Sequence, residues 1–88
     1  MRRARKVDSN QSEIVEALRR AGCRVEVLSD VGRGVPDLLV QCRLRLYLVE
    51  VKAPGESLTP AQRDFHDRWN CHIVHTVDEA IQWARWVR

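Results

Sequence analysis

The stretch Leu46–Lys52 (LYLVEVK) places an acid and a lysine inside a run of apolar residues. Its apolar residues fall at both odd and even positions, which is typical of a central strand that helices cover on both faces. Glu50 and Lys52 stand two residues apart, so their side chains share one face of that strand. Burying a charge is costly unless the charge is paired or binds a metal. The stretch therefore predicts both a central strand and a functional site on it.

A second acid, Asp37, begins the preceding predicted strand. If the two strands form a hairpin centred between Arg43 and Leu44, the numbers of antiparallel partners add up to 87, and Asp37 lies opposite Glu50. Directly opposed side chains have Cβ atoms roughly 5 Å apart, and like charges there repel each other. A divalent cation between them turns this repulsion into a binding site. Residues 42–45 (CRLR) contain no strong turn residue, and an odd loop length would shift the register by one.

The rest of the chain predicts the element order α-β-β-β-α-β-α, an α/β fold with a mixed sheet flanked by helices. Gly22 suits the C-terminal end of the first helix. Thr59, Pro60 and Gln62 open the second helix, and Gln62 completes a capping box. Asp78 is expected to cap the third helix. We expect helices to start near Ser9, Thr59 and Asp78, and strands to span about 23–28, 37–41, 46–53 and 72–76.

Two glutamines are candidate site residues. Gln11 lies on the apolar stripe of the first helix with Ile14 and Leu18, whereas Glu13 lies on the outer face. A polar side chain at that inward position could hydrogen-bond a metal-bound water, or the first helical turn could be frayed and leave it solvated. Gln62 shares a helix face with Phe65, His66 and Trp69, so it either only caps its helix or also reaches the site.

The acids and the lysine predict hydrolytic chemistry on phosphate. Mg²⁺ prefers oxygen ligands and keeps several waters, and the carboxylates of Asp37 and Glu50 with the carbonyl of Val51 could supply protein oxygens. A metal-bound water loses a proton readily and can attack phosphorus. Lys52 would neutralise the developing negative charge. The alternative is a cross-strand salt bridge between Lys52 and one acid, but the placement after Pro36 and Asp37, in this strand order, favours function.

Length and charge indicate one small domain with a basic arm. The 88 residues carry a net charge of +3. The first six residues contain four cations and no acid, while the remaining chain has 11 Lys and Arg against 12 acids. We expect an arm over 1–7 and a single domain over 8–88. The arm either binds phosphate or only improves solubility. Its cations are Arg2, Arg3, Arg5 and Lys6.

Cysteines, histidines and tryptophans point to packing rather than to a second site. Three cysteines without a CxxC pair make a poor disulfide framework or zinc site, so we expect reduced, mostly packed thiols. The histidines lack a metal-binding spacing and are interpreted as packing or surface residues. Trp83, Trp86 and Val87 form a helical stripe that could close a homodimer. No membrane span or signal peptide is visible, so we expect a soluble cytoplasmic protein. The residues in question are Cys23, Cys42, Cys71, His66, His72 and His75.

Three segments together resemble the VRR-NUC domain, the virus-type replication-repair branch of the PD-(D/E)XK nucleases. They are residues 32–40 (GRGVPDLLV), 48–52 (LVEVK) and 58–62 (LTPAQ), and the resemblance extends from about Gln11 to Ile81. It implies a restriction-endonuclease-like αβββαβ core with an added C-terminal helix. An additional family acid precedes the first-helix glutamine, and Asp8 is the nearby candidate here.

The resemblance implies a DNA nuclease that uses Mg²⁺ or Mn²⁺. Asp37 and Glu50 would be metal ligands, Lys52 the catalytic lysine, and Gln11 and Gln62 the family glutamines. Stand-alone members of this size, typical of phages and bacteria, look like homodimeric Holliday-junction resolvases. DNA contacts are expected from Arg33 and the basic arm. The alternatives are a non-catalytic DNA-binding module with a nuclease-like fold, and a nuclease subunit of a restriction or mobile-element system.

Overall fold

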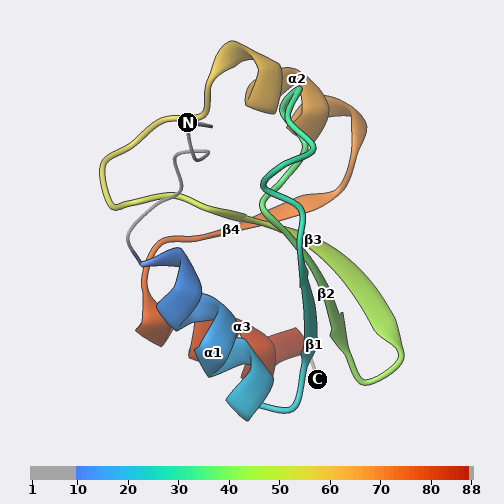
Figure 1. Ribbon diagram of the computed structural model, residues 1–88, viewed down its shortest axis with the longest axis vertical. Coiled ribbons are helices and arrows are strands. Elements are labelled where there is room, and N and C mark those ends of the chain that lie inside the picture. Colours follow the sequence, from blue (N-terminus) through green and yellow to red (C-terminus); the bar gives the residue numbers. More distant parts are fainter. Residues whose placement is uncertain (1–9, 88) are drawn as a thin grey trace, which may run out of the picture.

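The computed structural model describes residues 10–87, which form three helices and a four-stranded sheet (Figure 1). The elements are α1 (Gln11–Arg20), β1 (Arg24–Val27), β2 (Leu38–Cys42), β3 (Arg45–Val51), α2 (Pro60–Arg68), β4 (Cys71–Val74) and α3 (Val77–Val87). This order and the α/β class agree with the prediction. The predictions made above for six residues concern positions outside the described part of the chain, namely Arg2, Arg3, Arg5, Lys6, Asp8 and Ser9.

The sheet is mixed, with strand order β1-β2-β3-β4. β1, β2 and β3 pair antiparallel, and β4 runs parallel to β3. The β2–β3 pairing runs from Leu38 opposite Val49 to Cys42 opposite Arg45, so the predicted register, in which partners add up to 87, is confirmed. The two-residue turn closes because Arg43 adopts a positive φ of 59°, the conformation that tight hairpins require.

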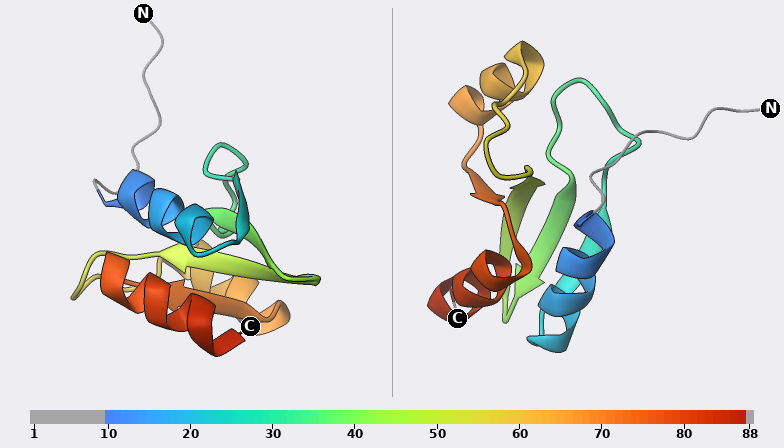
Figure 2. Two further views of the ribbon diagram at one scale, coloured as in Figure 1. Left: turned by 90° about the horizontal axis from the view of Figure 1, so that it is seen from below. Right: turned by 90° about the vertical axis from the view of Figure 1, so that its left-hand side faces the viewer.

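Helices α1 and α3 pack together on one face of the sheet. The fully buried core joins Leu18 of α1 and Ala84 of α3 to Leu38, Val40 and Val49 of the two central strands. Figures 1 and 2 show α1 and α3 together at one end of the molecule and α2 at the other end. The apolar stripes of α1 and α3 therefore pack against the same face of the sheet.

The opposite face of the sheet is largely open. Leu46 of β3 is 65% exposed, and Ile73 of β4 is also exposed. Helix α2 lies near the end of the sheet and contains no fully buried residue. The expectation that helices cover β3 on both faces is therefore wrong for its hairpin end, around Leu46, whereas Glu50 at the other end of the strand is buried.

The helix ends follow local capping rules, with one correction. Gly22 adopts a positive φ of 97° after α1, and the predicted capping box of α2 is present. The expected cap of α3, Asp78, lies inside the first turn instead. The Thr76 hydroxyl accepts a hydrogen bond from the Glu79 backbone N–H at 3.1 Å, so the helix starts earlier. At its actual position the Asp78 carboxylate interacts favourably with the helix dipole.

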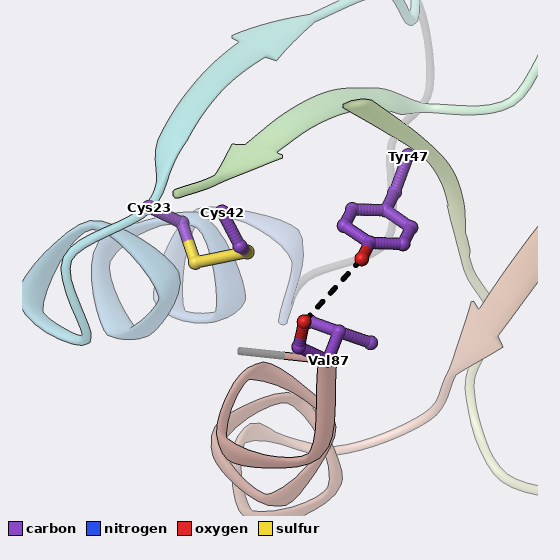
Figure 3. Close-up of a disulfide and its surroundings, with 4 residues drawn as sticks. All are labelled: Cys23, Cys42, Tyr47 and Val87. Carbon is purple, nitrogen blue, oxygen red and sulfur yellow. Dashed lines mark hydrogen bonds between the residues drawn. A yellow bond between two sulfur atoms is a disulfide. The ribbon is translucent and has the colours of Figure 1, made fainter. Parts of the chain in front are cut away.

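A disulfide joins Cys23 to Cys42 (Figure 3). The β1–β2 register pairs Arg24 with Gln41, and one more step places the two cysteines opposite each other, with Cα atoms 4.5 Å apart. The expectation of reduced thiols is therefore wrong for this pair, because cross-strand neighbours need no CxxC spacing. Cys71 is a free thiol.

The predicted tryptophan stripe of α3 is divided between the interior and the surface. Trp83 packs edge-on against Tyr47, and its indole N–H donates to Nδ1 of His72 at 3.1 Å. Trp86 is 80% exposed. Trp83 is therefore a packing residue, and Trp86 remains available to a partner.

Between residues 10 and 87, every helix is too short or too polar to span a bilayer.

Candidate active site

The two predicted acids, Asp37 and Glu50, lie at the end of the sheet where β2 begins and β3 ends. Glu50 is nearly fully buried (2% exposed), and Asp37 directly precedes β2. The ladder between β2 and β3 ends here with Leu38 opposite Val49, so one further step of the same register places Asp37 opposite Glu50. The geometry predicted from the turn thus brings both carboxylates to one end of the sheet.

Asp37 is held by the backbone of the neighbouring strand. Its Oδ2 atom accepts a hydrogen bond from the Val51 N–H at 2.9 Å. The Asp37 carbonyl accepts from the Leu28 N–H at 2.6 Å, which ties the same residue to the chain that follows β1. Asp37 is therefore anchored on both sides, by its side chain and by its main chain.

Gln62 links α2 to the buried acid. Its Nε2 donates to Oε2 of Glu50 at 3.3 Å, while its Oε1 accepts from the Thr59 N–H at 2.9 Å. One amide group therefore caps the helix and also contacts Glu50, so the alternative that Gln62 is only a capping residue is wrong.

Gly34 lets the loop before Asp37 approach the start of α2. A Cβ atom built on Gly34 would lie 2.2 Å from the Ala61 carbonyl oxygen, and the residue has a positive φ of 81°. Only glycine fits both conditions. The loop and the helix that carries Gln62 therefore pack closely at this point.

Gln11 reaches Asp37 through Ser29. Gln11 is 7% exposed, and its Nε2 donates to the Ser29 hydroxyl at 3.1 Å. The Ser29 oxygen lies 3.5 Å from Oδ1 of Asp37. The frayed, solvated alternative for Gln11 is therefore wrong. Sequence reasoning missed Ser29, because a lone serine in a polar loop carries no distinguishing pattern.

Lys52 lies half-buried just beyond the end of β3. Within residues 10–87, no ion pair joins it to an acid, so the alternative of a cross-strand salt bridge finds no support. Burial lowers the pKa of His66 on α2, the charge of Asp67 opposes this, and the Lys52 ammonium adds to the lowering. His66, interpreted from the sequence as a packing or surface residue, therefore lies within electrostatic range of Lys52.

Glu50 also affects Cys71 on the adjacent strand. Burial raises the pKa of the Cys71 thiol, and the negative charge of Glu50 raises it further. The thiol is thereby kept protonated, which argues against a nucleophilic role.

Arg33 lies exposed in the loop before Asp37, with a positive φ of 58°, and no described contact brings it to the acids.

The oxygen donors at this end of the sheet are of the kind that a hard cation prefers. No group of three or more His, Cys, Asp or Glu side chains that could hold a metal occurs among residues 10–87. Mg²⁺, however, is usually held by only one or two carboxylates and retains several waters. Asp37, Glu50 and the Val51 carbonyl are donors of the required kind. The set suits Mg²⁺ or Mn²⁺ better than zinc, which favours nitrogen and sulfur ligands.

Comparisons with known proteins support the fold. No family model matches the chain, and no curated protein does either. A solved structure described as a "VRR_NUC domain" is similar: it shares 30% sequence identity with this chain and superposes with a TM-score of 0.70. The match covers 85% of this chain and 89% of that chain. The likeness therefore extends over nearly the whole of both molecules.

Proposed function

The chain belongs to the VRR-NUC family, and from this membership we propose that it is a metal-dependent endonuclease that hydrolyses phosphodiester bonds in DNA. The observation that carries the proposal is the joining of Asp37 to Val51, in the middle of the Glu50-Val51-Lys52 segment, by a 2.9 Å hydrogen bond. This bond holds Asp37, at the start of β2, beside the segment at the end of β3 that carries Glu50 and Lys52.

Each residue of the proposed active site has a separate role. Asp37, Glu50 and the Val51 carbonyl would hold Mg²⁺, with Mn²⁺ as a substitute. When bound, the ion supplies an acidified water and neutralises charge on the phosphate. Lys52 stabilises negative charge that develops on the phosphate oxygens. Gln62 orients the Glu50 carboxylate through the 3.3 Å hydrogen bond.

Branched DNA is the proposed substrate, and a homodimer is the proposed assembly. A two-fold dimer presents two active sites in fixed relation, which suits a four-way junction. Arg33 and the basic arm (Arg2, Arg3, Arg5, Lys6) are proposed DNA contacts. We place the protein in the bacterial cytoplasm, or in that of a phage host, where such DNA occurs.

The test is cleavage of defined DNA by the purified chain. Labelled duplex, flap and four-way junction DNA are incubated with Mg²⁺, Mn²⁺ or EDTA, and the protein mass in solution is measured in parallel. We expect metal-dependent nicking that is fastest on branched DNA. Intact substrates in the presence of folded protein would exclude an enzyme that acts alone, and cleavage only with a partner chain would favour a restriction or mobile-element subunit.

Variants separate a nuclease from a DNA-binding module of the same fold. Asp37→Asn and Lys52→Met should each lower the cleavage rate at least about 100-fold and leave junction binding in Ca²⁺ intact. Asp30→Asn, which alters an exposed acid on the same loop, is the matched control and should cleave normally. A pure binding module would show no cleavage in any of these proteins and equal binding in all of them.

A further inference from the structure

A groove of about 690 Å³ lies between the β2–β3 hairpin and the C-terminal end of α3. Figure 1 shows both segments at the same end of the molecule. The hairpin turn at one end of the groove is separated from Asp37 and Glu50 by the length of β2, roughly 17 Å at about 3.4 Å per residue. Tyr47 and His72 also line the groove, but side chains alternate along a strand, so these two lie on the sheet face opposite to Glu50. The groove is therefore distinct from the candidate active site.

The walls of the groove carry positive charge and no acid. Arg43 and Arg45 line it, both are exposed, and neither forms an ion pair within residues 10–87. His72 also lines it, but burial lowers the pKa of this imidazole. Guanidinium groups that have no carboxylate partner are well suited to bind a phosphate.

Aromatic rings complete the groove. Trp86 is 80% exposed, which is unusual for so large an apolar side chain, and Tyr47 also lines the groove. Proteins bind unpaired nucleotides by stacking the base on such a ring while cations contact the backbone. A duplex offers no free base face for this purpose.

We propose that this groove binds an unpaired nucleotide, with its base on Trp86 and its phosphate on Arg43 and Arg45. A second copy of the chain fits less well, because pairing the groove with itself would bring four guanidinium groups together without an acid. The proposal extends the proposed DNA substrate to its single-stranded parts, and it does not depend on cleavage.

The experiment measures binding in EDTA, where no metal-dependent cleavage occurs. Labelled oligo-dT, a duplex of equal length and free dTMP are titrated with the full chain. Trp86→Ala should weaken oligo-dT binding about tenfold, and Arg43→Asn with Arg45→Gln should weaken it and reduce its salt dependence. Asn is chosen at Arg43 because it tolerates a positive φ. Binding of dTMP that Trp86→Ala abolishes would identify free nucleotides as a further ligand.

Controls keep the outcome interpretable. Trp69→Ala and Arg24→Gln change an exposed tryptophan and an exposed arginine elsewhere, and both should bind oligo-dT normally. Circular dichroism confirms folding of each variant. Unchanged oligo-dT binding by folded Trp86→Ala, or equal losses for oligo-dT and duplex, overturns the proposal. Failure of the wild-type chain to cut DNA bears only on the proposed nuclease function.

A second inference rests on different atoms, those of the buried Ser29. Its hydroxyl accepts a hydrogen bond from Gln11 Nε2 at 3.1 Å and has one proton to donate. The possible acceptors are Gln11 Oε1 at 3.3 Å and Asp37 Oδ1 at 3.5 Å. A carboxylate is the stronger acceptor, so the proton is best placed toward Asp37. We infer that Ser29 is a positioning residue that transmits the orientation of Gln11 to the Asp37 carboxylate.

The test reads metal binding directly, since the inference rests on the proposed function. Mn²⁺ is titrated into DNA-free protein and followed by electron paramagnetic resonance. Ser29→Ala should weaken Mn²⁺ binding about tenfold, the lower range for a residue that supports a ligand, and Ser29→Thr should restore it. Unchanged Mn²⁺ binding by Ser29→Ala overturns this inference alone, whereas a wild-type chain that binds no Mn²⁺ overturns it together with the metal dependence.

Discussion

The backbone N–H of Val51 donates to the Oδ2 atom of Asp37 across 2.9 Å. Val51 lies between Glu50 and Lys52, so the acid of one strand is tied to the main chain of the next strand within the Glu-Val-Lys segment. No substitution at Val51 other than proline removes this backbone donor. The relation between the two strands is therefore robust, and the sensitive contacts are those made by side chains around them.

The contact between Gln62 and Glu50 can be separated from the capping role of Gln62. Gln62→Ala loses both roles, whereas Thr59→Ala loses the 3.2 Å cap to the Gln62 N–H and leaves the amide free to reach Glu50. Each change should lower the free energy of unfolding by about 1 kcal/mol. Only Gln62→Ala should also lower the DNA cleavage rate. Equal cleavage by both variants would show that the glutamine acts only as a cap.

The close approach at Gly34 should make this position intolerant of a side chain. Gly34→Ala adds both an unfavourable positive φ and a clash with the Ala61 carbonyl. Gly55→Ala is the matched control, because Gly55 also has a positive φ but nothing within 4 Å of the added Cβ. Urea unfolding should show a loss of about 1 kcal/mol for Gly55→Ala and a larger loss for Gly34→Ala. Similar losses would mean that the loop and α2 separate easily.

The Cys23–Cys42 disulfide should stabilise the fold. It closes a loop of 19 residues, for which a loss of about 3 kcal/mol on removal is expected. Dithiothreitol should therefore lower the urea midpoint of the wild-type chain and have no further effect on a Cys23→Ala/Cys42→Ala variant. Cys71→Ala should respond to reductant as the wild type does. Three titratable thiols in the native, unreduced protein would contradict the bond, which is uncommon in cytosolic proteins.

His72 should make stability fall at acidic pH. Its Nδ1 accepts the Trp83 N–H, which requires the neutral ring, and burial lowers its pKa below the ordinary 6.5. Below 6.5 the unfolded chain therefore binds more protons at this residue, and stability is lost as the pH falls from 6.5 to the lowered value.

The measurement for His72 compares urea midpoints at pH 7.5 and 5.0. His72→Phe keeps a ring against Tyr47 but cannot be protonated, so its loss of stability between these two pH values should be smaller than that of the wild type. A residual loss is expected because burial also lowers the pKa of His66. Identical losses in both proteins would exclude His72 as a source of the pH dependence.

Features that depend on local sequence patterns were predicted correctly more often than contacts between segments that are distant in the chain. The hairpin register followed from residue numbering alone, and the capping box and the inward face of Gln11 followed from helical spacing. Thr76 and Asp78 are both residue types that can cap the start of α3. Which of them is the cap depends on where β4 ends, and this cannot be determined from helical spacing. The Ser29 contact and the Cys23–Cys42 bond join segments through space, and no periodicity in the chain encodes such contacts.

The open face of the sheet was mispredicted for a related reason. The apolar residues of β3 indicated two covered faces, but the number of available helices and their connections decide what can cover them. Helix α2 is tied by Gln62 to the end of the sheet at Glu50, so it cannot also cover Leu46. The apolar composition of a strand shows which of its residues can be buried. It does not show whether a helix is present to bury them.

The turn at Arg43 and Leu44 has a consequence for how this gene can vary. The turn already has the minimum of two residues, so loss of one codon there forces β3 to slip against β2. A slip of one residue would send the Asp37 and Glu50 side chains to opposite faces of the sheet, and a slip of two would separate them along the strands by about 7 Å. A deletion far from every active-site residue would thus take the two carboxylates apart while leaving each of them in the chain.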